Sequence, residues 1–149
     1  MEIMFEFNVF SKDFPVEDVF KKIGIPEGEI IRHEETAIEM SCGEKYIREK
    51  ECCITYSTGY IETYDTEIPM QMIYKMLLPK ESIICECIEK YNLFSKFGVI
   101  INLSDNPIIN LSRDFISMAS NFHAEIEFDT YLDNNEEHYV EATHFYDSN

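Results

Sequence analysis

Apolar and polar side chains alternate along two stretches of this chain, one at residues 2–10 and the other at residues 124–131. A period of two residues is typical of a β-strand that buries one of its faces. In the first stretch Ile3, Phe5, Phe7 and Val9 alternate with Glu2, Met4, Glu6 and Asn8; in the second Ala124, Ile126, Phe128 and Thr130 alternate with Glu125, Glu127, Asp129 and Tyr131. Both stretches predict strands of a sheet that has one buried face and one open face.

Three other stretches space their apolar residues at helical intervals. They predict helices over residues 14–23, 67–91 and 112–122, the second interrupted near Pro79 because proline cannot continue an α-helix. Gly24 and Pro26 indicate where the first helix stops, and Ser112 is a suitable N-cap for the last one. These helices lie between the predicted strands, so the chain mixes both kinds of element along its length.

Further strands are predicted at residues 51–58, 96–104 and 108–111, and residues 28–50 predict a hairpin with Ile30–Met40 and Lys45–Lys50 as its arms. The element order favours an α+β domain over residues 1–131, with a mainly antiparallel sheet and helices packed on one face, as in ferredoxin-like folds. In that plan the first and last strands are neighbours. Residues 132–149 are predicted to form an acidic C-terminal tail.

Acidic residues dominate the chain, which has a formal net charge of -17. No Lys or Arg follows Arg113, whereas residues 114–149 contain nine Asp or Glu residues. Such a charge disfavours nucleic acid and anionic membranes as partners and favours a basic protein. The sequence lacks an apolar run of the roughly 20 residues that a membrane-spanning helix requires, and the N-terminus lacks the basic start of a signal peptide. We therefore expect a cytoplasmic location.

Five cysteines are present: Cys42, Cys52, Cys53, Cys85 and Cys87. The odd number and the adjacent pair favour reduced thiols over a disulfide framework. Their spacings also differ from the C-x-x-C pairs of common zinc sites. No phosphate-binding glycine loop, nucleophile elbow or H-E-x-x-H motif occurs. We therefore expect no metal, no cofactor and no catalytic residues.

The most distinctive polar feature is the row formed by Glu125, Glu127 and Asp129, hereafter the carboxylate row. Alternate residues of a strand share a face and lie about 6.5–7 Å apart. Two such carboxylates suit glycoside hydrolysis, where the carboxyl groups are about 5–9.5 Å apart. The other interpretations are an interaction surface and a solvated sheet face.

Several segments resemble domain of unknown function 4279, a bacterial family. They are Phe7–Phe10, Asp13–Pro15, Lys22–Pro26, Cys53–Thr58, Lys90–Leu93, Leu111–Ile116 and Ala124–Tyr131, of which the last is the most specific. The resemblance covers roughly residues 3–132 and implies a compact α+β domain. The family often has a tryptophan near Cys53, and this chain has no tryptophan. Some members look like immunity proteins encoded beside secreted toxins, but the family supplies no catalytic residues.

The charge and the resemblance together favour a non-enzymatic, immunity-type binding protein that neutralises a basic toxin, such as a nuclease, by docking on it. Its expected partner-binding residues are Glu6, Glu125, Glu127, Asp129, Tyr131, Glu136 and Glu137. Glu6 belongs to this set if the first and last strands are neighbours. The alternative is a small-molecule-binding or hydrolytic domain that uses the carboxylate row.

Overall fold

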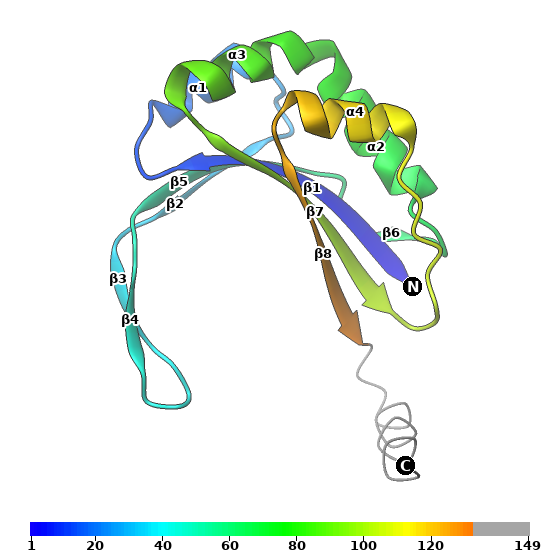
Figure 1. Cartoon of the computed structure of the whole chain (residues 1–149), viewed down its shortest axis with the longest axis horizontal. Coiled ribbons are helices and arrows are strands. Elements are labelled where there is room, and N and C mark those ends of the chain that lie inside the picture. Colours follow the sequence, from blue (N-terminus) through cyan, green and yellow to red (C-terminus); the bar gives the residue numbers. More distant parts are fainter. Residues whose placement is uncertain (133–149) are drawn as a thin grey trace.

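The computed structural model describes residues 1–132 and shows helices packed against one face of a curved sheet (Figure 1). None of the helices formed by residues 1–132 lies on the other face of the sheet (Figure 1). All but one of the strand pairings are antiparallel. The predicted α+β class, with a mainly antiparallel sheet and helices on one face, is confirmed.

Strand β1 (Glu2–Ser11) lies in the middle of the sheet. It pairs antiparallel with β5 (Glu51–Ser57) on one side and with β7 (Phe94–Leu103) on the other. The side chains of Ile3, Phe5, Phe7 and Val9 are at most 1% exposed, as their alternation predicted. Hydrophobic burial on one face of these three strands therefore fixes which face meets the helices.

The outer strands extend the sheet to the order β2-β5-β1-β7-β8, with β6 (Ile61–Glu62) pairing with the start of β1. Strand β2 (Glu29–His33) runs antiparallel to β5, whereas β8 (Glu125–Leu132) runs parallel to β7. The expectation that the first and last strands are neighbours, as in a ferredoxin-like fold, was wrong. Both edges of β1 are already paired, and α4 (Arg113–Asn121) returns the chain to the start of β7, which makes β8 its parallel neighbour.

The helices are α1 (Val16–Ile23), α2 (Glu67–Leu77), α3 (Glu81–Tyr91) and α4, with a short 3-10 helix η1 (Leu78–Lys80) between α2 and α3. Gly24 ends α1 with a φ of 72°, a conformation that glycine adopts without strain. Ser112 caps α4, because its hydroxyl accepts a hydrogen bond from the Phe115 amide at 3.2 Å. The three predicted helical regions and the interruption at Pro79 are confirmed, with ends shifted by one or two residues.

An aromatic cluster joins the sheet to α4. The ring of Phe97 lies 4.7 Å from the ring of Phe7 and 4.7 Å from that of Phe115, measured between centroids. Phe122, which follows α4, packs 5.0 Å from Phe7. All four rings are fully buried. Aromatic residues bury more apolar area than other side chains, so this cluster is a main source of stability.

A two-stranded arm, residues 34–50, projects from the sheet (Figure 1). It consists of β3 (Thr36–Glu39) and β4 (Lys45–Arg48), which pair only with each other. The predicted hairpin is confirmed in its second half, but its first arm is divided into β2, in the main sheet, and β3. The short strand predicted at residues 108–111 is reduced to a single bridge between Asp65 and Ile108.

All five cysteines are free thiols, and Cys52 lies in the hydrophobic core. The acidic tail was predicted at residues 132–149, of which only Leu132 lies within the described residues.

Gly28 lies close to the buried ring of Tyr56 and the half-buried ring of Phe20. A Cβ atom at this position would lie 2.8 Å from Cδ1 of Tyr56 and 2.9 Å from Cε2 of Phe20. The Tyr56 ring is fully buried and cannot move aside without disturbing the core.

We expect Gly28→Ala to lower the free energy of unfolding by about 1–3 kcal/mol, the usual effect of overpacking. Gly98→Ala is the matched control, because its new Cβ would meet only Glu6, at 3.8 Å from Oε2. Its effect should stay within about 0.5 kcal/mol, as is usual for a substitution that meets no special feature. Urea denaturation of both variants gives the comparison, and equal losses would contradict the proposed clash.

Candidate functional site

The open face of the sheet carries most of the residues expected to bind a partner. Pairing across the strands places Glu6 of β1 opposite Gly98 of β7, and Gly98 opposite Glu127 of β8. Directly paired residues of neighbouring strands point to the same face. Glu6 and the carboxylate row therefore share the open face, as expected, although β7 separates their strands.

The carboxylate row is exposed to solvent. Glu125, Glu127 and Asp129 are all exposed on β8 and point away from the helices. Tyr131 continues the row, and its hydroxyl donates a hydrogen bond to Oδ2 of Asp129 at 2.9 Å. This bond and the charge of Asp129 raise the pKa of Tyr131, so its phenol stays protonated at neutral pH. Of the remaining predicted residues, Glu136 and Glu137 lie outside the described part of the chain.

Lys96 interrupts the acidic surface and was not among the predicted partner-binding residues. Its Nζ atom lies 3.5 Å from Oε1 of Glu127, and its charge also acts on Glu6. Burial raises the pKa of Glu6, while a hydrogen bond from Asn8 and the charge of Lys96 partly oppose that rise. The signal was present in the sequence, because Lys96 has the opposite parity to Phe97, Val99 and Ile101 and so had to lie on the open face.

Beside Glu6 the open face holds a small polar network between β1 and β5. The Thr55 hydroxyl donates to Oδ1 of Asn8 at 2.7 Å, and the Cys53 thiol lies 3.5 Å from the same hydroxyl. Burial is the main cause that raises the pKa of Cys53, with the charges of Glu51 and Glu6 adding to it. A thiol with a raised pKa holds its proton and is a poor nucleophile. This network therefore fits a structural role.

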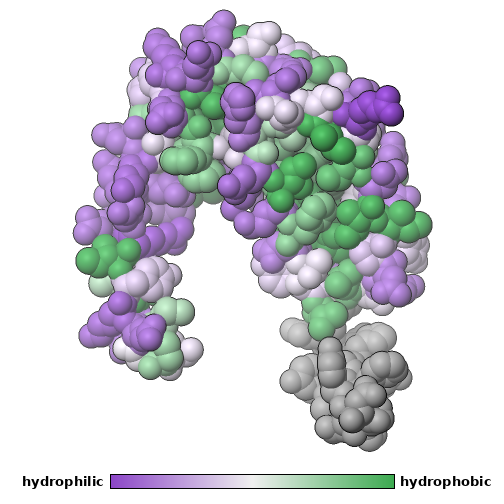
Figure 2. All heavy atoms as spheres, in the orientation of Figure 1, coloured by the Kyte–Doolittle hydropathy of each residue, from purple (hydrophilic) through white to green (hydrophobic). Residues whose placement is uncertain are grey.

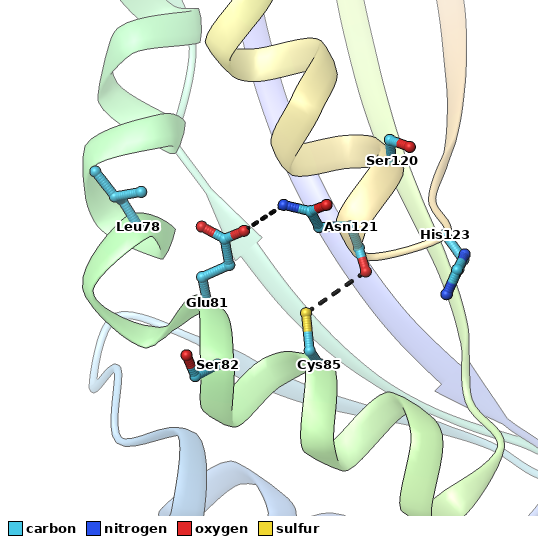
Figure 3. Close-up of a pocket in the computed structure, with 7 residues that line it drawn as sticks. All are labelled: Leu78, Glu81, Ser82, Cys85, Ser120, Asn121 and His123. Atoms are coloured by element: carbon cyan, nitrogen blue, oxygen red, sulfur yellow. Dashed lines mark hydrogen bonds between the residues drawn. The ribbon is translucent and has the colours of Figure 1, made fainter.

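A second group of polar residues lines a hollow of about 780 Å³ between α3 and the end of α4. Figure 3 shows the Asn121 amide pointing toward Glu81, to which it donates a hydrogen bond of 2.7 Å. The Cys85 thiol donates a hydrogen bond of 3.5 Å to the backbone carbonyl of Asn121 (Figure 3). His123, which follows α4, also lines the hollow (Figure 3). Cysteine, histidine and asparagine also occur in thiol hydrolases. Here burial and the charge of Glu81 raise the pKa of Cys85, which is opposite to what thiolate chemistry requires.

The carboxylate row does not lie in this hollow, nor in the smaller pocket at the base of the arm. A glycosidase needs its two carboxylates on either side of an enclosed bond. Within residues 1–132 there is also no group of three or more His, Cys, Asp or Glu side chains that could hold a metal ion. Exposed carboxylates in line on a strand can attract positive charge at the surface.

Hydrophobic side chains gather over the region of α4 and β8, whereas the arm is mostly hydrophilic (Figure 2). Ile116 of α4 is 49% exposed, and Phe128 and Leu132 of β8 are 44% and 71% exposed. Alternate residues of a strand share a face, and Ile126 packs against the core. Phe128 and Leu132 therefore lie with Ile126 on the helix side of β8. Strand β8 thus presents acids on one face and apolar side chains on the other.

None of the helices in the described part of the chain is long and apolar enough to cross a membrane. No curated protein and no solved structure matches this sequence. A family model described as "Domain of unknown function (DUF4279)" matches residues 1–133, which confirms the resemblance drawn from the segments between Phe7 and Tyr131. The match spans the sheet, the helices of the described residues and the carboxylate row, and on this basis the chain belongs to the DUF4279 family.

Proposed function

We propose that this protein binds a basic protein partner through the open face and the outer edge of β8. The observation that supports this most strongly is the carboxylate row, three exposed acids in line on a strand at the edge of the sheet. The row belongs to a chain whose net charge is -17, so the local and the overall fields attract the same kind of partner. Within the carboxylate row Lys96 forms an ion pair with Glu127, whereas Glu125 and Asp129 form no ion pair in the described residues.

The outer edge of β8 supports a specific mode of binding, the addition of a strand from the partner. In the described residues β8 pairs with β7 alone, so the backbone groups on its other side are open to an added strand. A strand that alternates basic and apolar residues would place its bases on the carboxylate row and its apolar side chains against Phe128. A second copy of this chain fits poorly, because pairing β8 with itself would bring two rows of like charge together.

The family to which the chain belongs suggests what kind of partner this is, because some of its members look like immunity proteins encoded beside toxins. We infer an immunity-type protein that acts in the cytoplasm and neutralises a basic toxin by covering part of its surface. Enzymes that act on nucleic acid carry basic surfaces to hold their substrate, so a nuclease toxin has the required charge. The alternative, a small-molecule-binding or hydrolytic site on the carboxylate row, is less well supported because the row is exposed and lies in neither pocket.

Affinity capture from the native host tests the proposal. Wild-type protein should retain a basic protein whose binding weakens with salt, and Glu125→Lys, Glu127→Lys and Asp129→Lys together should abolish its capture. The matched control reverses three exposed acids elsewhere, Glu27, Glu67 and Glu89, and so has the same net charge as the triple variant. The control should still capture the partner. Loss of the partner from both variants, or from neither, would contradict docking at the carboxylate row.

A further inference from the structure

A pocket of about 420 Å³ lies where the arm leaves the sheet. Its lining includes Phe10 at the end of β1 and Lys12 just after that strand. The start of β7 contributes Phe94, and the end of the arm contributes Arg48 and Lys50. Pockets for small molecules have volumes of about 300–1,000 Å³, so this one has the size of a small ligand site. The pocket lies at the C-terminal end of β1. The last residues of β8 lie at the other end of the sheet, beside the part of β7 that pairs with Glu2.

Basic residues are concentrated in this pocket. The chain has 12 Lys and Arg residues against 29 Asp and Glu, yet three bases line the pocket and only two acids, Glu49 and Glu51. Lys12 pairs with Glu49 at 2.7 Å, whereas Arg48 and Lys50 form no ion pair within residues 1–132. The charge of this region is therefore opposite in sign to that of the molecule as a whole.

Two stacked rings accompany the bases. Phe10 and Phe94 are directly paired across β1 and β7, and their ring centroids lie 5.8 Å apart with an interplanar angle of 25°. An aromatic pair across two strands stabilises a sheet, which accounts for the stacking alone. It does not account for the position of Phe94, which is 65% exposed at the pocket and leaves much of its ring uncovered. An exposed aromatic surface beside free basic side chains is suited to a ligand with a ring and a negative charge.

We propose that this pocket binds a small molecule that carries both a flat ring and a phosphate group. Its ring stacks on Phe94, and its phosphate accepts hydrogen bonds from the Arg48 guanidinium and the Lys50 ammonium. Arginine matches the geometry of phosphate because its N–H groups form a planar fork. A long polyanion is repelled by the net charge of -17, but a small anion at the pocket experiences mainly the nearby charges, since the screening length is about 8 Å at physiological salt.

Titration of the isotope-labelled protein with 1-naphthyl phosphate and with AMP, followed by amide chemical shifts, tests this site. We expect saturable shifts at residues 10–12, 48–51 and 92–94 with a dissociation constant of about 0.1–1 mM. Adenosine lacks the phosphate and ribose 5-phosphate lacks the ring, so each should bind at least about 10-fold more weakly than AMP.

Variants identify the residues that bind. Arg48→Ala and Phe94→Ala should each weaken binding of 1-naphthyl phosphate about 10-fold, while their spectra show that the fold is kept. Lys45→Ala is the matched control, because Lys45 lies on the same arm but outside the pocket. The absence of saturable shifts up to about 5 mM of both probes would overturn the proposal. Equal loss of affinity in Arg48→Ala and Lys45→Ala would do the same, because it would indicate general charge attraction. Neither outcome bears on the binding of a basic partner at β8.

Discussion

Phe97→Ala is expected to lower the free energy of unfolding by about 3–5 kcal/mol, the usual cost of removing a buried aromatic ring. The ring of Phe97 is fully buried between the rings of Phe7 and Phe115, and it joins the middle of the sheet to α4. Domains of this size are stabilised by about 5–15 kcal/mol in total, so the variant should retain only a small margin. Urea denaturation followed by circular dichroism measures the change.

Phe94→Ala is the control for that experiment, because it removes the same ring from the same strand. Phe94 has the opposite parity and is 65% exposed on the open face. It loses only its stacking with Phe10, so the expected cost is about 1 kcal/mol. Similar losses at positions 94 and 97 would show that the helices do not cover the face on which Phe97 lies.

Neutralising the carboxylate row is expected to slow association with a basic partner about 10- to 100-fold. The variant Glu125→Gln, Glu127→Gln, Asp129→Asn keeps the size of each side chain and removes its charge, although each amide replaces one acceptor oxygen by an NH₂ donor. Because charge acts mainly during the diffusional approach, dissociation should change less than association. Rates measured over a range of salt concentrations, once the partner has been isolated, give both quantities.

The salt dependence provides a second readout of the same variant. Association of the wild-type protein should slow steeply as salt is added, and the dependence should be weaker for the neutral variant because screening has fewer charges on which to act. Neutralising Glu27, Glu67 and Glu89 serves as the control for net charge. An association rate that the neutral row leaves unchanged would mean that the partner binds elsewhere on the molecule.

Local periodicity was sufficient to predict most of the helices and strands. Ile3, Phe5 and Phe7 alternate because one face of β1 is buried, and the same rule placed Glu125, Glu127 and Asp129 together on the open face. The helix ends followed from residues with distinct backbone preferences, such as Gly24 and Pro79. These features depend on neighbours within a few positions of one another, so a single sequence contains them.

Long-range placement could not be obtained in the same way. Periodicity determines which face of β8 is buried but not which strand lies beside it, so the insertion of β7 between β1 and β8 was missed. The pocket at the base of the arm was missed for the same reason. Its basic residues, Lys12, Arg48 and Lys50, come from two distant parts of the chain that meet only after β1 and β5 have paired.

The position of the arm shows where this chain could change in length without loss of the core. Strands β2 and β5 are already antiparallel neighbours, and His33 and Glu51, where the arm leaves the sheet, are directly paired. None of the residues 34–50 between them is buried, so the core gains nothing from their presence. A tight turn can join two strands that end side by side, and lengthening such a connection costs little closure entropy. The arm is therefore a place where the length of the chain can change while the packing of the sheet and helices stays the same.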